Sequence, residues 1–222
     1  MAHSKRISTG YGKNHKWVVT PKPGSHRKLD SIPLQIVIRD ELGLADNARE
    51  AKKIIREGLV LINGVIRRTH NFSLGVMDVI QIPKIKKNFL VLPSKNGILV
   101  TETSDAGAKI KLRKIVGKKT VKGSKTQLML SDGSTQIADK VKCGVGDTLV
   151  LETESGKTKK VLQFKEGNTA LIVFGVYSGQ VGKIAEKLPA TSASKSLTKV
   201  GELTTLSEYV LVVGEEKPLI PL

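Results

Sequence analysis

The segment of residues 47–68, NAREAKKIIREGLVLINGVIRR, constrains the fold of this chain more than any other part of the sequence. Asn47 followed by Glu50 three residues later resembles the capping box that starts a helix. Asn63-Gly64 lies between two apolar runs, and this dipeptide is the strongest short hairpin signal because both turn residues need positive φ. We therefore expect a helix and then a β-hairpin in this segment.

The basic side chains of the expected helix gather on one face. At 100° per residue, four of them fall within about 100° of arc, broadly opposite the apolar residues. The four are Arg49, Lys52, Lys53 and Arg56. A solvated helix face usually has acids at i,i+4 positions, and no acid lies between these cations on the face itself. Given the positive charge of the whole chain, we interpret the face as RNA-facing rather than merely solvated. Gly58 ends the helix, and the returning hairpin strand brings Arg67 and Arg68 near the same end.

A second helix is expected before this one. Ser31 would cap it, and Pro33 is tolerated in its first turn. Its apolar face consists of Leu34, Val37, Ile38 and Leu42. These positions have the i, i+3, i+4, i+8 spacing of one helical face, and Gly43 ends the helix.

The charge balance of the whole chain points to a polyanionic partner. The 222 residues include 37 Lys and Arg against 20 Asp and Glu, a net charge of +17, and such an excess repels itself in a compact state. The net charge is +6 over residues 1–30, +4 over 31–92, +8 over 93–165 and −1 over 166–222. Nucleic acid is the first candidate and a membrane surface the second. The membrane is disfavoured because no apolar run approaches the ~20 residues that span a bilayer, and no apolar segment of about 7–15 residues follows the basic N-terminus.

Residues that carry catalytic or metal chemistry are scarce. A single cysteine, Cys143, excludes an internal disulfide and fits a reducing compartment, and the four histidines show no metal-ligand spacing. We expect no metal, no cofactor and no catalytic residue. Asp30 in the RKLD stretch is similar to the catalytic element of pseudouridine synthases, but it lies in a Pro/Gly/Lys-rich arm without the preorganised pocket that catalysis needs. No GxSxG or GxxxxGK[ST] motif occurs.

Residues 1–30 form a basic arm that cannot bury enough apolar surface to fold alone. We expect this arm to become ordered on RNA. The residues expected to contact RNA are Lys5, Arg6, Lys13, Lys16, Trp17, Arg27 and Lys28. For Trp17, two interpretations stay open: packing on the neighbouring domain, or stacking on an RNA base.

Residues 93–165 predict short antiparallel strands separated by turns. Charged and apolar residues alternate in KIKLR, residues 109–113, which predicts a strand with one apolar and one cationic face. Eight Lys and Arg fall between residues 109 and 125 without an acid, and this density favours phosphate contact over ordinary edge protection. They are Lys109, Lys111, Arg113, Lys114, Lys118, Lys119, Lys122 and Lys125.

Near the C-terminus, an apolar strand of residues 170–174 leads into three glycines, Gly175, Gly179 and Gly182. Their spacing suits tight turns and close backbone approach. The segment, EGNTALIVFGVYSGQVGKI, resembles the KOW motif, which lies in an SH3-like barrel and occurs in ribosomal proteins and NusG-type transcription factors. The resemblance implies that the three glycines contact RNA.

The order of these parts resembles one family over nearly the whole chain. Residues 47–68 resemble the small RNA-binding domain named after ribosomal protein four, and the basic arm, basic β domain and KOW segment around it are similar to the e-type small-subunit ribosomal protein four family of archaea and eukaryotes. Local matches are HSKR at 3–6, KW at 16–17, PGSH at 23–26, SIPL at 31–34, GVMDV at 75–79 and GN at 167–168. The chain departs from the family in lacking an Ala-Pro element between Arg6 and Lys16, and in having Phe174 where Gly is common. It ends without the basic extension of eukaryotic members, which favours an archaeal source.

The resemblance implies a structural constituent of the small ribosomal subunit in the cytoplasm, not an enzyme. Its partners would be small-subunit ribosomal RNA and neighbouring ribosomal proteins, without a membrane or a small-molecule substrate. It implies an α+β, mostly β fold in four parts: the arm (1–30), a four-type RNA-binding domain (31–92), a central basic β domain (93–165) and a KOW SH3-like domain (166–222). Two alternatives stay open: an RNA-modifying enzyme, and a KOW-containing transcription or translation factor.

Overall fold

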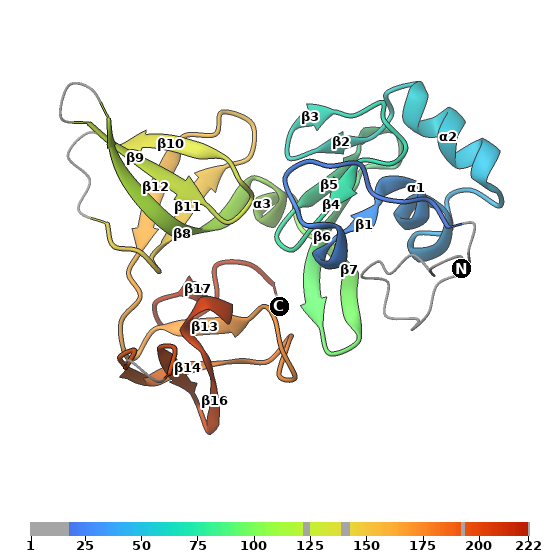
Figure 1. Cartoon of the computed structure of the whole chain (residues 1–222). Coiled ribbons are helices and arrows are strands. Elements are labelled where there is room, and N and C mark those ends of the chain that lie inside the picture. Colours follow the sequence, from blue (N-terminus) through green and yellow to red (C-terminus); the bar gives the residue numbers. More distant parts are fainter. Residues whose placement is uncertain (1–17, 122–124, 139–142, 192–193, 222) are drawn as a thin grey trace, which may run out of the picture. The chain divides into compact units, whose positions relative to one another are not determined.

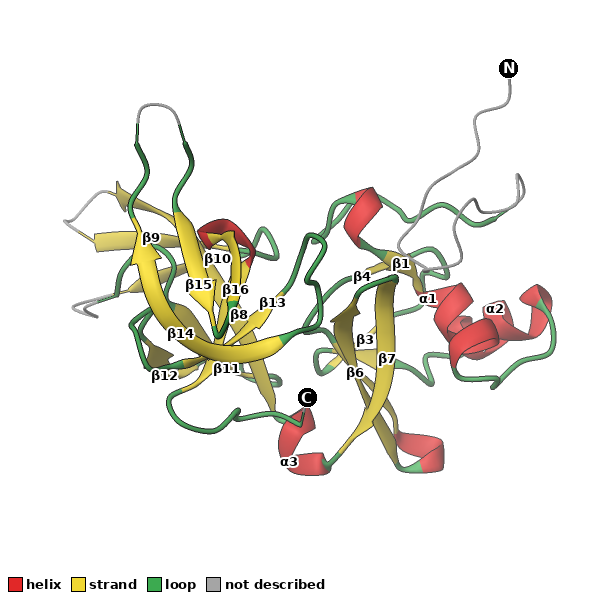
Figure 2. Cartoon of the chain, turned by 90° about the horizontal axis from the view of Figure 1, so that it is seen from below, coloured by secondary structure: helices red, strands yellow, loops and turns green. Residues whose placement is uncertain are grey.

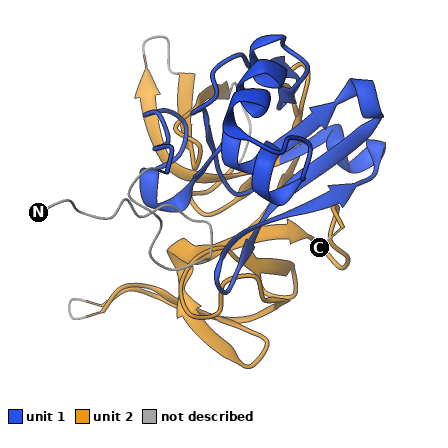
Figure 3. Cartoon of the chain, turned by 90° about the vertical axis from the view of Figure 1, so that its right-hand side faces the viewer, with its two compact units in different colours: residues 1–111 blue, residues 112–222 orange. Residues whose placement is uncertain are grey.

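The computed structural model describes residues 18–121, 125–138, 143–191 and 194–221. The chain forms two compact units, unit 1 (residues 1–111) and unit 2 (residues 112–222), shown in Figure 3. Most of the described elements are β-strands (Figure 2), so the expected α+β class with mostly β structure is confirmed. In the described part of the chain, no helix is both long and apolar enough to cross a bilayer.

Unit 1 combines short helical elements with an antiparallel sheet (Figure 1). The helical elements are η1 (Lys28–Asp30), α1 (Leu34–Ile36), the π-helical η2 (Val37–Glu41), α2 (Ala48–Arg56), η3 (Pro83–Ile85) and α3 (Asp105–Ala108). The strands are β1 (Ile32–Pro33), β2 (Leu61–Ile62), β3 (Val65–Ile66), β4 (Ser73–Leu74), β5 (Val79–Ile82), β6 (Lys87–Ser94) and β7 (Gly97–Thr103). Five of these strands pair in the order β3-β2-β5-β6-β7, and β1 pairs with β4.

The expected capped helix and hairpin are confirmed. The side-chain Oδ1 of Asn47 accepts hydrogen bonds from the backbone N–H groups of Arg49 (2.9 Å) and Glu50 (3.0 Å), so Asn47 caps α2. The turn between β2 and β3 has φ values of 50° at Asn63 and 77° at Gly64. These are the two positive angles that this hairpin turn requires.

The prediction that Ser31 caps a helix is wrong. Ile32 and Pro33 form β1, which pairs antiparallel with Leu74 and Ser73 of β4, and the N-cap position of α1 is Pro33, without a side-chain hydrogen bond. Pairing with a strand later in the chain takes these residues out of the helix. The apolar face expected from this segment is nevertheless buried, in a core shared by α1, η2, α2 and the sheet.

Unit 2 contains two five-stranded antiparallel sheets (Figure 1). The first has the order β10-β9-β8-β11-β12 and the second the order β16-β15-β14-β13-β17. The strands are β8 (Ile110–Val121), which begins in unit 1, β9 (Lys125–Leu130), β10 (Thr135–Ala138), β11 (Thr148–Glu152), β12 (Thr158–Leu162), β13 (Thr169–Ile172), β14 (Val181–Leu188), β15 (Leu197–Val200), β16 (Leu203–Leu206) and β17 (Val210–Gly214), with a short helix η4 (Ser207–Tyr209).

The first half of β8 does not have the expected division into one apolar and one cationic face. Leu112 and Arg113 are neighbours in the strand, yet both are buried. The pairing of β8 with β9 also shifts register between Ile115 and Gly117, as a bulge does when it re-aims side chains. The alternation prediction is therefore wrong at Arg113, whose side chain lies inside unit 2 and not on its surface.

Candidate nucleic-acid interface

The four cations of α2 form an exposed surface, which we call the α2 basic face: Arg49, Lys52, Lys53 and Arg56. Lys52 is half-buried and the other three are exposed. Ala51 and Ile55 on the opposite side are buried in the core of unit 1. The four basic side chains line an open hollow together with Ala48 and Glu57. The expected separation of the four cations from the buried Ala51 and Ile55 is confirmed, whereas Ala48 and Glu57 lie nearer to the cations than helical periodicity predicts.

Glu50, the acid inside α2, belongs to the cap of the helix. Its Oε1 accepts from Nδ2 of Asn47 (2.9 Å), and its Oε2 accepts from the backbone N–H of Asp46 (3.0 Å). Glu50 thus reaches back to the start of the helix as in a capping box, but it accepts from the side chain of Asn47 and from the residue before the cap, not from the backbone N–H of Asn47. Its carboxylate is therefore engaged at the N-terminal end, and the α2 basic face keeps its positive charge.

The two arginines after the hairpin differ in their surroundings. Arg68 is exposed, and a Cβ placed on Gly58 would lie 3.4 Å from its Nε atom. Its guanidinium therefore lies at the C-terminal end of α2 and extends the α2 basic face. Arg67 is half-buried, with its guanidinium carbon 4.7 Å from the centre of the Phe72 ring, as in a cation–π contact.

His70 is a member of this surface that the sequence did not reveal. Burial lowers the pKa of its imidazole, and the positive charges of Lys52 and Arg56 lower it further. The imidazole therefore lies within electrostatic reach of the α2 basic face. Its position two residues after Arg68, in the turn that follows the returning strand of the hairpin, is the pattern that could have indicated it.

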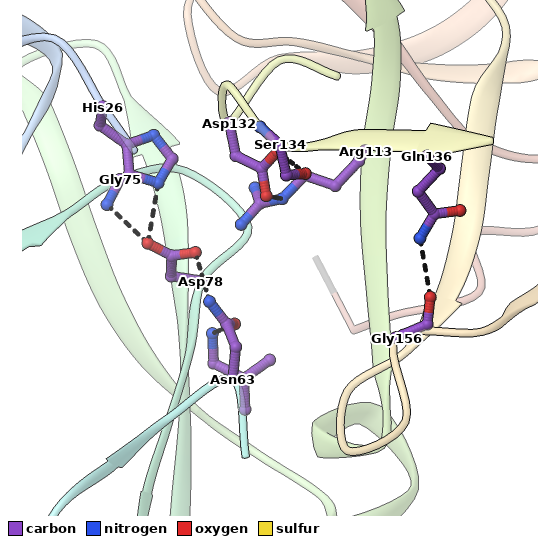
Figure 4. Close-up of polar contacts among 10 residues, drawn as sticks. His26, Asn63, Gly75, Asp78, Arg113, Asp132, Ser134, Gln136 and Gly156 are labelled. Carbon is purple, nitrogen blue, oxygen red and sulfur yellow. Dashed lines mark hydrogen bonds and ion pairs between the residues drawn. The ribbon is translucent and has the colours of Figure 1, made fainter. Parts of the chain in front are cut away.

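The described part of the arm, residues 18–30, is held on unit 1. The backbone N–H of Lys22 donates to the carbonyl of Asn71 (2.7 Å). Figure 4 shows the second contact, in which Nε2 of His26 donates to Oδ2 of Asp78 (2.9 Å). Arg27 and Lys28 follow directly and are exposed. The other predicted arm contacts lie outside the described residues: Lys5, Arg6, Lys13, Lys16 and Trp17.

The remaining predicted cations are mostly exposed. Lys109 is exposed and Lys111 half-buried at the start of β8. Lys118 and Lys119 near the end of β8, and Lys125 at the start of β9, are exposed. The two strands pair antiparallel here, so these three cations lie toward the same end of the sheet. Lys122 lies outside the described residues.

Two predicted RNA contacts, Arg113 and Lys114, are used inside unit 2. The Nε of Arg113 forms an ion pair with Oδ2 of Asp132 at 3.0 Å, and the two side chains are 2% and 5% exposed. Asp132 also accepts hydrogen bonds from the backbone N–H and the hydroxyl of Ser134 (Figure 4). A buried charge needs such partners, which accounts for the inward direction of Arg113.

Lys114 also points inward, from β8 to the segment that precedes and begins β17. Its Nζ donates to the carbonyls of Ser207 (2.6 Å), Glu208 (3.1 Å) and Val210 (2.7 Å). Burial lowers the pKa of Lys114 to about 8, and the nearby carboxylate of Glu208 partly offsets this. The ammonium therefore links two sheets of unit 2.

Two of the three predicted glycines lie in the connection between β13 and β14, and the third, Gly182, lies in β14. Gly175 and Gly179 have φ values of 92° and 89°, a region that glycine adopts readily. Gly182 is paired with Ala170 in the β13–β14 ladder, and a Cβ there would lie 3.0 Å from the Val200 side chain. Each glycine thus has a local backbone or packing reason to be glycine.

Comparisons with known proteins agree over most of the chain. Residues 85–158 match the model described as Ribosomal family S4e, and residues 32–80 match the S4 domain. The small ribosomal subunit protein eS4 of Methanosphaera stadtmanae is 44% identical over 215 residues, covering 95% of this chain and 89% of that protein. The eS4 of Archaeoglobus fulgidus is 38% identical, covering 99% and 97%. The crystal structure of the 30S ribosomal protein S4e from Thermoplasma acidophilum matches with a TM-score of 0.76 and 30% identity, covering 86% of this chain and 98% of that one.

Proposed function

Because the chain belongs to the S4e family of ribosomal proteins, we propose that it is a structural constituent of the small ribosomal subunit. In the cytoplasmic ribosome it binds and stabilises small-subunit ribosomal RNA and adjoins other ribosomal proteins. Its role is structural and not enzymatic. The observation that carries the RNA-binding part is the α2 basic face, where four cations gather on one side of the helix and line one open hollow.

Phosphate contact is the chemistry that this face can perform. Lysine and arginine neutralise phosphates and release the counterions condensed on the nucleic acid. Double-stranded RNA offers side chains little base information in its deep, narrow major groove, so recognition there depends on shape and backbone. A rigid helix that holds cations at fixed spacing suits such a ligand, and Arg68 and His70 enlarge the surface.

The RNA-binding surface that we propose includes selected cations of both units. Its members are Lys5, Arg6, Lys13, Lys16, Trp17, Arg27, Lys28, Arg49, Lys52, Lys53, Arg56, Arg67, Arg68, His70, Lys109, Lys111, Lys118, Lys119, Lys122 and Lys125, with Gly175, Gly179 and Gly182. We leave out Arg113 and Lys114, because their charged groups already have partners inside unit 2.

The finer domain organisation is also a proposal. We divide the chain into the arm (1–30), the four-type RNA-binding domain (31–92), the central basic β domain (93–165) and a KOW SH3-like domain (166–222). The two separate five-stranded sheets of unit 2 support the last boundary. The glycine-containing connection between β13 and β14 supports the KOW interpretation.

Sedimentation of native extract on a density gradient, before and after a high-salt wash, tests the function. We expect the protein to travel with the small subunit and to survive the wash. Loss from the subunit at modest salt would favour a cycling factor or an RNA-modifying enzyme instead.

A matched pair of charge reversals tests the α2 basic face in the same gradient. Arg49→Glu/Lys53→Glu should reduce the subunit-bound fraction several-fold, since two phosphate contacts become repulsive. Lys183→Glu/Lys199→Glu makes the same charge change on exposed positions of β14 and β15 and should bind as the unaltered protein does. Equal losses for both pairs would mean that only net charge matters.

A further inference from the structure

We propose that His26 and the buried carboxylate of Asp78 form an anchor that positions the arm, so that Arg27 and Lys28 bind RNA together with the α2 basic face. This inference rests on the proposed function and assigns positioning residues to it. The anchor consists of His26, Asn63, Gly75 and Asp78, all in unit 1.

Asp78 lies at the centre of the anchor (Figure 4). It is only 2% exposed. Its Oδ2 accepts from Nε2 of His26 (2.9 Å) and from the backbone N–H of Gly75 (3.0 Å), and its Oδ1 accepts from Nδ2 of Asn63 (2.8 Å). A buried carboxylate is costly unless it is hydrogen-bonded. The three donors come from three separate segments, so satisfying this one group fixes the segments relative to one another.

Gly75 provides the space for the His26 ring. A Cβ on residue 75 would overlap three atoms of that ring, and the nearest heavy atoms to it all belong to His26. Gly75 has no positive φ, so its backbone alone would accept any residue. The side chain of His26 is only 10% exposed. The site is therefore shaped around this ring, and glycine is needed there because of it.

Asn63 connects the anchor to the cations at the end of α2. Asn63 lies in the hairpin turn, and its Oδ1 accepts from the backbone N–H of Val79 (3.0 Å). The hairpin strand after this turn leads to Arg68 at the end of α2. The carboxylate of Asp78 thus binds both Asn63 and His26. Asn63 lies in the turn before Arg68, and His26 directly precedes Arg27 and Lys28, so one carboxylate links two groups of cations.

This arrangement lowers the cost of ordering the arm on RNA. Fixing a free backbone costs conformational entropy, and rigidifying a segment in its bound conformation increases affinity by avoiding that cost. Residues 18–30 are already held at two points, Lys22 to Asn71 and His26 to Asp78. His26 need not touch RNA; it acts through the two cations that follow it.

The substitution Gly75→Ala tests the anchor without altering any polar group. The added methyl displaces the His26 ring, and RNA affinity should fall about tenfold. The slope of log K against log salt should also fall by about 1.4–1.8, the value for two lost phosphate contacts at 0.7–0.9 each. Gly144→Ala is the matched control, because its backbone has no positive φ and its Cβ would meet Asp147 only at 3.4 Å.

Two combined variants separate positioning from general destabilisation. Adding Gly75→Ala to Arg27→Gln/Lys28→Gln should cause no further loss of affinity if the anchor acts through those cations. Adding it to His26→Ala should also cost nothing, because the ring that the methyl displaces is gone. His26→Ala alone serves as the test if the Gly75→Ala protein does not fold.

The outcomes are distinct. A folded Gly75→Ala protein with unaltered affinity and salt slope would overturn the anchor, and so would a loss that adds fully to that of Arg27→Gln/Lys28→Gln. Failure of the unaltered protein to bind small-subunit RNA would overturn the proposed function instead. Amide exchange at Lys22, whose N–H is bonded to Asn71, reads the position of the arm without RNA and should accelerate in Gly75→Ala.

Discussion

The α2 helix and the β8 strand are both rich in cations and locally poor in acids, yet they use their charges differently. On α2, three of the four cations are exposed and the fourth is half-buried. On β8, Lys118 and Lys119 are exposed, whereas Arg113 and Lys114 serve internal contacts. A helix separates its faces by a 100° period that the sequence shows directly. The side chains of a strand inside a sheet find hydrogen-bond and ion-pair partners far along the chain. Local charge density therefore does not show which cations remain exposed to solvent.

The largest effect expected from this difference is on stability. Asp132→Ala leaves the buried guanidinium of Arg113 without its carboxylate, which should cost about 3–5 kcal/mol of unfolding free energy. Chemical denaturation of the full chain measures it. Glu102→Ala is the control, because its ion pair with Lys87 is about half exposed and should cost under about 1 kcal/mol. Equal costs would remove the distinction between internal and exposed cations.

RNA affinity, unlike stability, should depend on the exposed cations of α2 and not on the internal cations of β8. Replacing all four cations of the α2 basic face by Gln should lower affinity about 100-fold and reduce the salt slope by about 3, since about four phosphate contacts are lost. Lys114→Gln should leave the affinity of the folded protein unchanged. Filter binding over a salt series, with circular dichroism to verify folding, gives both values. A comparable loss from Lys114→Gln would place that lysine among the RNA contacts after all.

A smaller effect concerns Lys114 and pH. Burial lowers its pKa from 10.5 to about 8, so between pH 8 and 10.5 the unfolded chain binds more protons than the folded one. Stability contributed by this group therefore rises with pH in that window, by about 1 kcal/mol between pH 7 and pH 9. Denaturation of wild type and Lys114→Met at both pH values measures the difference. Parallel pH dependence in the two proteins would contradict the burial of the ammonium.

The smallest effect should appear at His70. Its pKa is lowered by burial, Lys52 and Arg56 in the free protein, and RNA phosphates beside the α2 basic face would counter the two cations. We therefore expect the pKa of His70 to rise when RNA binds. Titration of the imidazole by NMR with and without RNA follows this shift. An unchanged pKa would exclude phosphate from the neighbourhood of His70.

Sequence reasoning succeeded where the determinants are local. The capping of α2 by Asn47 and the positive φ values of Asn63 and Gly64 depend on a few adjacent residues. The capping role expected of Ser31 failed because Ile32 and Pro33 pair with β4, which lies far along the chain. A local signal cannot anticipate a competing partner of that kind.

The contacts of Lys114 and His26 were not predicted for the same reason, because their partners lie far away in the sequence. Lys114 meets carbonyls more than ninety residues away, and His26 meets Asp78 across 52 residues. Such pairs depend on the packed fold. The exposed cations of α2 could be identified because the helix period alone determines their direction.

The hairpin turn also sets a limit on the chemical lifetime of the chain. An asparagine followed by glycine loses its side-chain amide more readily than in other contexts, because the next backbone nitrogen can attack it. In the folded protein both ends of the Asn63 amide are hydrogen-bonded, to Asp78 and Val79. Deamidation would place a second carboxylate against the buried one, and like charges at such distance repel. We therefore expect folding to protect Asn63 from deamidation. A chain that stays unfolded for long would lose this amide, and its arm could then no longer be held by the anchor.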